Sequence, residues 1–201
     1  MAFHKIINDP VYGFITIDDE LINAIIAHPY YQRLRRIHQM AMAHLVYPGA
    51  VHSRLHHSLG AYHLMRCALQ ELMSKGIAIT PEEQQASKIA ILLHDIGHGP
   101  LSHTLEPIFS RQFGLNHHIV GEQILRGSSP FGGEITKILA AYRIDLDEVI
   151  SMLDGTHAGR HSYLFSGPIN LDTVEGISRA RAFVARSFRP VDPRLLVAAM
   201  A

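Results

Sequence analysis

The chain has 201 residues, of which 47% are hydrophobic and 18% are charged. That length and composition are typical of one globular domain with a buried core, so we expect residues 1–201 to form a single domain. The sequence contains neither a long uncharged apolar stretch nor a basic and apolar leader, which predicts a cytoplasmic protein without a membrane span or signal peptide. Because 18 basic residues balance 18 acidic ones, the basic excess that favours nucleic-acid binding is missing, and nucleic acid is not an expected partner.

The first elements expected along the chain are an extended segment and two short helices. Residues 3–17 mix β-branched and aromatic side chains with turn residues, which predicts a short β-hairpin or extended lead-in. Asp18 is expected to cap a helix that ends before Pro29, and a second amphipathic helix is expected from Tyr31 to Met40. The polar face of the second helix carries basic residues that we interpret as solvated, namely Arg33, Arg35 and Arg36.

Two helices with clear boundaries are expected next. Residues 53–74 place apolar side chains at helical spacing, and Gly76 ends this stretch. The run Thr80-Pro81-Glu82-Glu83 combines an N-cap, a proline at the first helical position and a capping-box glutamate. It therefore predicts a helix that continues through His94 and ends before Gly97.

The remainder of the chain also has helical spacing with polar or glycine boundaries. It predicts helices over residues 102–109, 116–125, 134–142, 145–153, 171–184 and 192–200. A long loop over residues 155–168 is expected to border a pocket. The predicted fold is an all-α bundle with a small β lead-in, an architecture in which metal and cofactor sites are built from side chains of facing helices.

The sequence contains 15 histidines, and several of them cluster with carboxylates. Histidine is the most common metal ligand and transfers protons near neutral pH. His94 and Asp95 are adjacent at the end of a predicted helix, where the backbone can turn so that both side chains reach one ion. Arg54 and His57 open an earlier helix at a spacing of three residues, which places them on one face, and Asp172 begins a later helix. The histidines and aspartates among these residues are candidate metal ligands.

The order His57, His94-Asp95, Asp172 resembles the His, His-Asp, Asp signature of the HD-domain superfamily of metal-dependent phosphohydrolases. Segments around the signature are similar to the deoxynucleoside triphosphate triphosphohydrolase branch of that superfamily. They occur in one consistent order and comprise Ile7 to Gly13, Gln32 to Arg36, Tyr47 to Ala50, Arg54 to Gly60 and His94 to His103. The resemblance implies that the helical bundle is an HD domain.

The resemblance implies one divalent metal ion held by His57, His94, Asp95 and Asp172. Two neutral imidazoles and two carboxylates balance a dication, and such a mixed nitrogen and oxygen set accepts iron, manganese, zinc, nickel or magnesium. Taken singly, each of these residues has a simpler interpretation as an ordinary core or surface side chain. It is their combination that favours a metal site.

The resemblance also implies catalytic and substrate-binding side chains around the ion. The catalytic group comprises Asp95, His98, Glu106 and His117, and the substrate-binding group comprises Gln39, Met40, Arg54 and His103. Imidazoles balance phosphoryl charge and protonate a leaving oxygen, and the planar guanidinium of Arg54 matches a phosphate. In this interpretation Glu106 orients His117. For each residue of the catalytic and substrate-binding groups, the alternative is an ordinary structural role.

The likeness to the triphosphohydrolase branch decays after Asp172. The lysine, tyrosine and aspartate that grip triphosphate and sugar in that branch are replaced here by Thr173, Gly176 and Ala180. His118 stands where a glutamate usually follows the catalytic histidine, and the chain ends at Ala201, before the region that completes the nucleotide pocket in longer relatives. Arg179 and Arg181 are candidates to replace part of the lost contacts with triphosphate and sugar.

The leading hypothesis is a metal-dependent phosphohydrolase that acts on a nucleotide or a related phosphate ester, with triphosphohydrolase-like activity on deoxynucleotides as its most specific form. The alternative is a non-catalytic HD module that binds a nucleotide or a partner through its metal pocket. The residues lost after Asp172 motivate that alternative. Self-association into a homo-oligomer is expected by analogy with the family.

Overall fold

The computed structural model describes residues 4–128, 133–157, 159, 162–167, 169–184 and 192. It begins with an antiparallel hairpin of β1 (Lys5–Asp9) and β2 (Gly13–Ile17). The α-helices that follow are α1 (Glu20–Ala27), α2 (Pro29–Gln32), α3 (Arg54–Ser74), α4 (Pro81–Leu93), α5 (Glu106–Phe113), α6 (His117–Leu125), α7 (Gly133–Ala141), α8 (Leu146–Leu153), α9 (Tyr163–Ser166) and α10 (Leu171–Val184). A short hairpin before a helical body confirms the predicted fold class.

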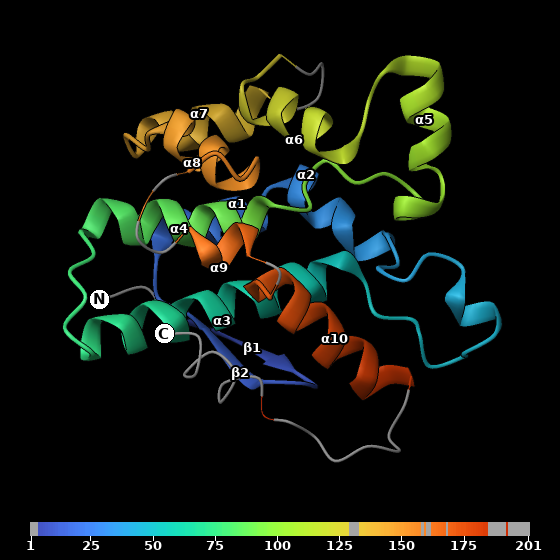
Figure 1. Ribbon diagram of the computed structural model, residues 1–201, viewed down its shortest axis with the longest axis horizontal. Coiled ribbons are helices and arrows are strands. Elements are labelled where there is room, and N and C mark those ends of the chain that lie inside the picture. The colour runs from blue at the N-terminus through green and yellow to red at the C-terminus, as the bar shows by residue number, and fades with distance from the viewer. Residues whose placement is uncertain are drawn as a thin grey trace.

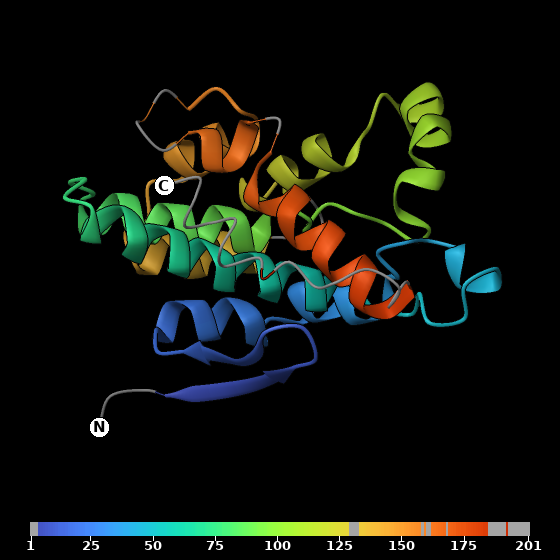
Figure 2. The ribbon, with the colours of Figure 1, turned by 60° about the horizontal axis from the view of Figure 1, so that its bottom comes forward.

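Helices α3 and α4 pack against each other and form the centre of the fold. The hairpin and α1 lie on one side of this pair and α8 lies on the other, as Figure 2 shows. Helix α10 crosses α3 (Figure 1). The core between these elements is built from fully buried apolar side chains, among them Ile25, Leu64, Met65, Leu92 and Val149. Over the described residues, the helices are too short or too polar to cross a lipid bilayer.

The predicted boundaries of the two central helices are confirmed. The Ser53 hydroxyl caps α3, and it forms a capping box with His56. At the start of α4, Thr80 Oγ1 accepts from the Glu83 backbone N–H at 3.1 Å, and Glu83 Oε2 accepts from the Thr80 backbone N–H at 2.7 Å. These reciprocal hydrogen bonds satisfy N–H groups that have no partner inside the helix. The prediction for α1 is wrong by one position, because its cap is Asp19.

The predicted helix from Tyr31 to Met40 is wrong. Helix α2 ends at Gln32, a 3-10 helix follows over Arg33–Arg36, and the chain then turns. An antiparallel bridge between His38 and Ser53 draws this segment onto the start of α3. Backbone pairing with a residue distant in sequence therefore replaces the local helical hydrogen bonds.

The predicted solvated face of this segment is also wrong for Arg33. Its guanidinium donates to the carbonyl oxygens of Ile96 and His98, and it lies over the Tyr30 ring with a separation of 4.5 Å. Arg33 is half-buried and fixes the loop after α4, whereas Arg35 and Arg36 are exposed as expected.

The helix predicted over residues 102–109 begins later and runs further. Leu101 and Ser102 have φ angles of 59° and 47°, in the left-handed region that disfavours residues with a side chain. A 3-10 helix over Ser102–Thr104 follows, and α5 then covers Glu106–Phe113. The strained conformation directs the Ser102 hydroxyl to the carbonyl oxygen of His38, to which it donates at 3.1 Å.

Two further predictions concern the carboxyl-terminal third. The loop predicted over residues 155–168 contains the short helix α9 in its described part. The helix predicted over residues 192–200 lies outside the described residues, apart from residue 192 itself. The helices predicted over residues 116–125, 134–142, 145–153 and 171–184 correspond to α6, α7, α8 and α10.

Helix α6 lies directly on the loop that follows α4. A Cβ atom added to Gly97 would lie 2.0 Å from the backbone oxygen of His117 and 2.5 Å from the backbone nitrogen of Gly121. Nothing lies within 4 Å of a Cβ added to Gly99, two positions further on. Only a residue without a side chain permits the close backbone approach at Gly97.

Gly97→Ala should therefore destabilise the protein, because α6 must move away from the loop. We expect the free energy of unfolding to fall by about 1–3 kcal/mol, as for overpacked core positions. Gly99→Ala is the matched control and should change it by less than about 0.5 kcal/mol. Urea denaturation followed by circular dichroism measures both. Equal stabilities of the two variants would contradict the close packing of α6 on this loop.

Candidate metal centre

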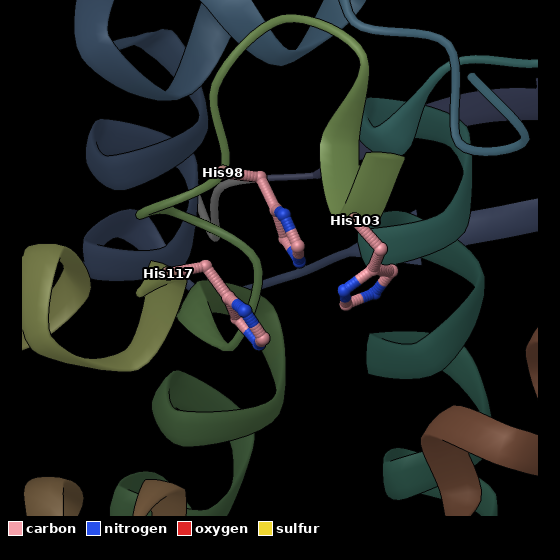
Figure 3. A group of neighbouring side chains, drawn as sticks. All are labelled: His98, His103 and His117. Atoms are coloured by element: carbon pink, nitrogen blue, oxygen red, sulfur yellow. The ribbon is translucent and has the colours of Figure 1, made fainter. Parts of the chain in front are cut away.

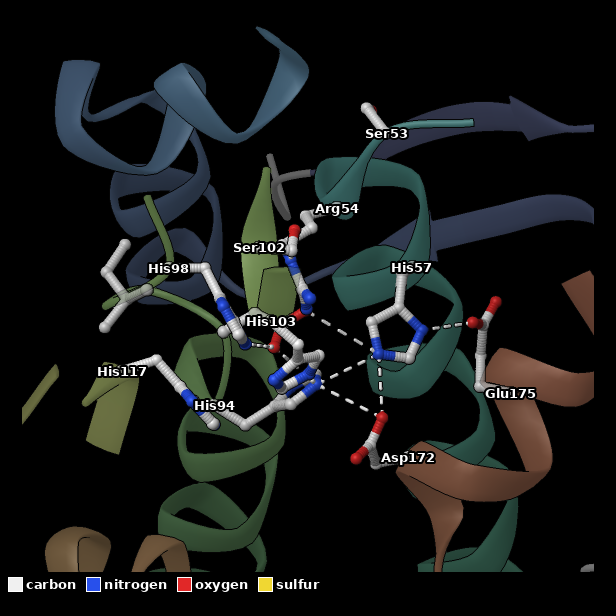
Figure 4. Close-up of polar contacts among 12 residues, drawn as sticks. Ser53, Arg54, His57, His94, His98, Ser102, His103, His117, Asp172 and Glu175 are labelled. Atoms are coloured by element: carbon white, nitrogen blue, oxygen red, sulfur yellow. Dashed lines mark hydrogen bonds and ion pairs between the residues drawn. The ribbon is translucent and has the colours of Figure 1, made fainter. Parts of the chain in front are cut away.

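Three side chains meet where α3, α4 and α10 come together. His57 lies in the first turns of α3, His94 is the C-cap of α4, and Asp172 lies in the first turn of α10. The Nε2 atoms of His57 and His94 are 3.0 Å apart, and Asp172 Oδ1 is 2.8 Å from the first and 3.6 Å from the second. Figure 4 shows these side chains pointing toward one another. Residues far apart in the sequence thus place three potential ligand atoms within reach of one ion.

The second nitrogen of each imidazole already has a partner. His57 Nδ1 contacts the Glu175 carboxylate, and His94 Nδ1 donates to the Ile91 carbonyl oxygen at 2.7 Å. In their neutral forms both rings therefore direct an Nε2 lone pair toward the Asp172 carboxylate. Lone pairs that converge on a negative charge require a cation between them. This donor set consequently fits a divalent metal ion.

The carboxylate of Asp95 lies beside these ligands. Its Oδ2 is 3.7 Å from His57 Nε2, and its Oδ1 is 3.6 Å from His94 Nε2. Oδ2 also accepts from Arg54 Nη1 at 2.6 Å, and Oδ1 is 3.3 Å from His98 Nε2. Asp95 is therefore placed to serve as a fourth ligand while it holds the Arg54 guanidinium at the edge of the site.

Without a metal ion, the electrostatics of the group favour charged acids and charged imidazoles. Burial alone would raise the pKa of Asp95 and of Asp172, but nearby positive charges and hydrogen bonds from the imidazoles lower both below their usual range. Burial alone would lower the pKa of His57, yet the charge of Glu175 and further acidic neighbours raise it to about 10. The pKa of His94 is raised for the same kind of reason. A metal ion that binds here displaces protons from both rings, so its affinity falls as the pH falls.

A buried charged network supports His57 from behind. Asp9, Glu175 and Arg179 are all at most 4% exposed. Arg179 Nε donates to Glu175 Oε1 at 2.6 Å, and Arg179 Nη1 lies 3.0 Å from Asp9 Oδ2. Gly60 provides the space for this network, because a Cβ atom there would lie 2.2 Å from Glu175 Oε1. The network connects the turn of the hairpin to α3 and α10, and through Glu175 it fixes the orientation of the His57 ring.

This network corrects one expectation and adds a residue that the sequence does not single out. Arg179 does not replace a lost phosphate contact, because its side chain is fully buried and faces Asp9 and Glu175. Glu175 is missed by sequence reasoning, although its position three residues after Asp172 on α10 places both on one face. Ser102 is also missed, and its hydroxyl accepts from Arg54 Nε at 2.8 Å.

A second group of imidazoles lies on the other side of Asp95. His98 follows α4, His103 lies in the 3-10 helix after it, and His117 begins α6. Glu106 Oε2 accepts from His103 Nδ1 at 2.8 Å, while Glu106 Oε1 accepts from the His117 backbone N–H at 3.0 Å and also contacts its Nδ1. The His98 and His117 rings are stacked with their centroids 4.0 Å apart. The structure thus brings the predicted catalytic histidines together with Glu106.

The charges of this second group follow from its surroundings. Burial alone would raise the pKa of Glu106, but hydrogen bonds from His117 and His103 lower it to about 2. Burial lowers the pKa of His98 to about 2, and it also lowers the pKa of His117. Near neutral pH the acid is therefore ionised, and His98 and His117 are neutral rings that can accept or donate a proton.

The two groups border one cavity of about 430 Å³. Of the predicted substrate-binding residues, Gln39, Arg54 and His103 line this cavity, whereas Met40 is not among the described residues of its wall. Gly176 lies beside it, because a Cβ atom there would be 3.6 Å from Gln39 Nε2. At this position, which carries a tyrosine in the triphosphohydrolase branch, a side chain would therefore begin in ordinary van der Waals contact with Gln39.

Known proteins resemble this chain in sequence and in fold. The model of the family described as HD domain matches residues 54–161, which include His57, His94 and Asp95. The uncharacterized protein YwfO of Bacillus subtilis (strain 168) is 30% identical over 201 residues, which are 100% of this chain and 45% of that protein. Deoxynucleoside triphosphate triphosphohydrolase SAMHD1 of Gallus gallus is 36% identical over 156 residues, which are 74% of this chain and 25% of that protein.

A solved structure shows the same fold. The crystal structure of a phosphohydrolase from Bacteroides thetaiotaomicron VPI-5482 superposes with a TM-score of 0.83 at 34% identity, covering 98% of this chain and 46% of that one. The chain thus spans less than half the length of these three proteins. The matches confirm the resemblance to the triphosphohydrolase branch that the sequence motifs indicate. Because the family model matches more than half of its residues, the chain belongs to the HD domain family.

Proposed function

We propose that the chain is a metal-dependent phosphohydrolase that acts on nucleotides or related phosphate esters. One observation carries the proposal: the ligand atoms of His57, His94 and Asp172 converge beside a cavity that Arg54 and His117 also line. A set of metal ligands at the wall of a cavity with cationic and proton-transferring groups suits the cleavage of a phosphate ester. The named activities of the similar phosphohydrolase and of SAMHD1 support the same reaction class.

The residues that would hold the metal ion are His57, His94, Asp95 and Asp172. Iron, manganese, zinc, nickel and magnesium all suit two imidazoles and two carboxylates. When bound, such an ion polarises a phosphoryl oxygen and lowers the pKa of a coordinated water. Glu175 contacts the Nδ1 atom of His57 and so keeps the His57 ring oriented for metal binding.

The remaining side chains bind the phosphate and manage its proton. Arg54 is held by Asp95 and Ser102, so its guanidinium is pre-oriented at the cavity wall and offers a planar donor to a phosphate oxygen. His98 is 2% exposed and presents a ring nitrogen to the same cavity. His117 Nδ1 donates a hydrogen bond to Glu106, which leaves the Nε2 lone pair to accept a proton from the attacking water and to pass it to the leaving oxygen.

The finer form of the proposal is triphosphohydrolase-like activity on deoxynucleotides. Gln39 supports it, because it lines the cavity where the branch binds the sugar. Thr173, Gly176 and Ala180 stand where the branch has the side chains that contact triphosphate and sugar, so the expected binding of such a substrate is weakened. The location of the protein in the cytoplasm and its self-association into a homo-oligomer remain predictions.

Reconstitution tests the proposed reaction. Metal-free protein is loaded in turn with Mn²⁺, Fe²⁺, Zn²⁺, Ni²⁺ and Mg²⁺ and is offered nucleoside mono-, di- and triphosphates, with products separated by chromatography. We expect turnover of at least one substrate with at least one metal. Binding of metal without turnover of any substrate would contradict the proposal. A ligand-induced rise in melting temperature without product would instead indicate the non-catalytic HD module, which the loss of residues after Asp172 motivates.

His117→Ala should lower turnover about 10²-fold to 10³-fold, the contribution of a general acid or base. The ion at the site of His57, His94 and Asp172 should be retained, because His117 is outside that set. His44→Ala is the control, since His44 is half-buried and hydrogen-bonds locally to the Ala41 carbonyl oxygen. Initial rates and elemental analysis of the variants measure both effects. An active His117→Ala variant would remove the assigned proton transfer and leave the metal site in place.

A further inference from the structure

A second cavity, of about 440 Å³, borders the loop that follows α4. It shares His98 and His117 with the cavity of the candidate metal centre, but its described wall contains none of the four proposed metal ligands. Most of this wall is apolar, and Phe109, Leu115 and Val120 contribute to it. A cavity of this size and character is typical of sites that enclose a small organic molecule.

Arg33 brings a positive charge to this wall. Its guanidinium donates to the carbonyl oxygens of Ile96 and His98 and lies over the Tyr30 ring, and all of these partners are neutral. Burial lowers the pKa of Arg33, and Tyr30 opposes this shift. Among the described residues no carboxylate forms an ion pair with Arg33, and its Nε atom is buried without a hydrogen-bond partner. A cation without a counter-charge at the wall of a cavity favours an anionic ligand.

Gly99 leaves room for a ligand in the same wall. A Cβ atom added to Gly99 meets nothing within 4 Å, and this residue borders the cavity. Its φ angle is outside the left-handed region, so a side chain at this position causes no backbone strain. A larger residue at position 99 therefore extends into the cavity without displacing a neighbour at its point of attachment.

We propose that this cavity binds a small organic carboxylate with an apolar body. The apolar part packs against Phe109, Leu115 and Val120, and the carboxylate pairs with the Arg33 guanidinium. A guanidinium has more N–H donors than the carbonyl oxygens of Ile96 and His98 accept from, so donors remain for a planar carboxylate.

The charges around the cavity favour a ligand with one negative charge. Glu106 also lies in the wall, and it remains ionised because it accepts hydrogen bonds from His103 and His117. A nucleotide brings several negative charges close to this carboxylate, and an apolar wall does not replace the water that phosphate groups lose on binding. A monocarboxylate avoids both costs.

The rings of His98 and His117 report on occupation of the cavity, because both residues border it. The rings are stacked with their centroids 4.0 Å apart, and Figure 3 shows the two side chains extending in a similar direction from the loop after α4 and from the start of α6. An aromatic ligand in the cavity should therefore shift the ring-proton NMR signals of both residues. The signals of His63, which lies on α3 outside the described wall, should not shift.

Naphthalene-2-carboxylate and its neutral analogue naphthalene-2-carboxamide test the proposal on the full chain. Calorimetry should give a Kd for the carboxylate that is at least about tenfold lower, because only the carboxylate carries the charge that pairs with Arg33. The NMR signals of His98 and His117 should shift during the same titration. Equal affinities for the two compounds, absence of binding, or binding that leaves both signals unchanged would overturn the proposal.

Three variants locate the ligand. Gly99→Leu should weaken binding of the carboxylate at least about tenfold, since the leucine side chain fills the cavity. Ser110→Leu adds the same side chain at an exposed position of α5 outside the described wall, and it should leave the Kd unchanged. Asp172→Asn should also keep the wild-type Kd, because the proposed site needs no metal ion.

Two results of this series would contradict the proposal. Undiminished binding to folded Gly99→Leu would place the ligand elsewhere, and loss of binding in Asp172→Asn would assign it to the candidate metal centre. These measurements use no substrate, so their outcome is independent of turnover and of the proposed function.

Discussion

Asp172→Asn should reduce turnover about 10³-fold, which corresponds to a loss of roughly 4 kcal/mol of transition-state stabilisation. Asp172 Oδ1 lies 2.8 Å from His57 Nε2 and 3.6 Å from His94 Nε2, so it completes the group that would hold the ion. The neutral amide removes the charge that balances the dication and is a weaker ligand. The fold should be unaffected, since half of the Asp172 side chain is exposed.

The comparison variant for this change is Asp147→Asn. Asp147 is 81% exposed and pairs with Arg126 on the surface. It is distant in sequence from every proposed metal ligand. It should keep both its metal and its turnover. Rates at saturating metal, together with metal content after dialysis, separate weakened metal binding from weakened chemistry. Full activity of Asp172→Asn without added metal would refute the assignment of Asp172 as a ligand.

Arg179→Met should lower the free energy of unfolding by about 3–5 kcal/mol, the usual cost of breaking a buried ion pair by removing one partner. Arg179 is fully buried between Asp9 and Glu175, and methionine leaves both carboxylates without a counter-charge. Because Glu175 also contacts His57 Nδ1, the affinity for metal should fall in the same variant. Urea denaturation and metal titration measure the two effects.

Lys75→Met provides the control for the ion-pair argument. Lys75 pairs with Glu71 one helical turn away, and both side chains are more than one-third exposed, at 43% and 38%. Its replacement should lower the free energy of unfolding by no more than about 0.5 kcal/mol. If Arg179→Met were as stable as Lys75→Met, the buried network would contribute little to folding, and the support of His57 by Glu175 would need another explanation.

The sequence predicts much of this fold because many of its signals are local. The sequence predicts that helices start at Ser53 and at the capping box of Thr80, and both predicted starts agree with α3 and α4 of the structure. The motif order His57, His94-Asp95, Asp172 indicates a shared site because these residue types suit one ion. The motif could not by itself establish that the three helix positions come within ligand distance, which depends on how α3, α4 and α10 pack.

The features that the sequence does not reveal depend on distant contacts. The segment after Gln32 follows a bridge between His38 and Ser53 instead of its helical periodicity. The left-handed backbone at Leu101 and Ser102 has no signal in the residue types, since neither is glycine or asparagine. The sequence predicts that Arg179 replaces part of a lost substrate contact, but the hairpin brings Asp9 against its side chain. In each case tertiary contacts override a local preference.

The backbone contact of Gly97 with α6 bears on how such a protein can diversify. His98 is attached to Gly97 and His117 opens α6, so this main-chain contact helps to set the separation of these two histidines. The side chains that shape the surrounding chamber can then be exchanged during evolution without disturbing that separation. Under the proposed function, substitutions on the cavity wall would change the substrate preference while the spacing of His98 and His117 stays the same.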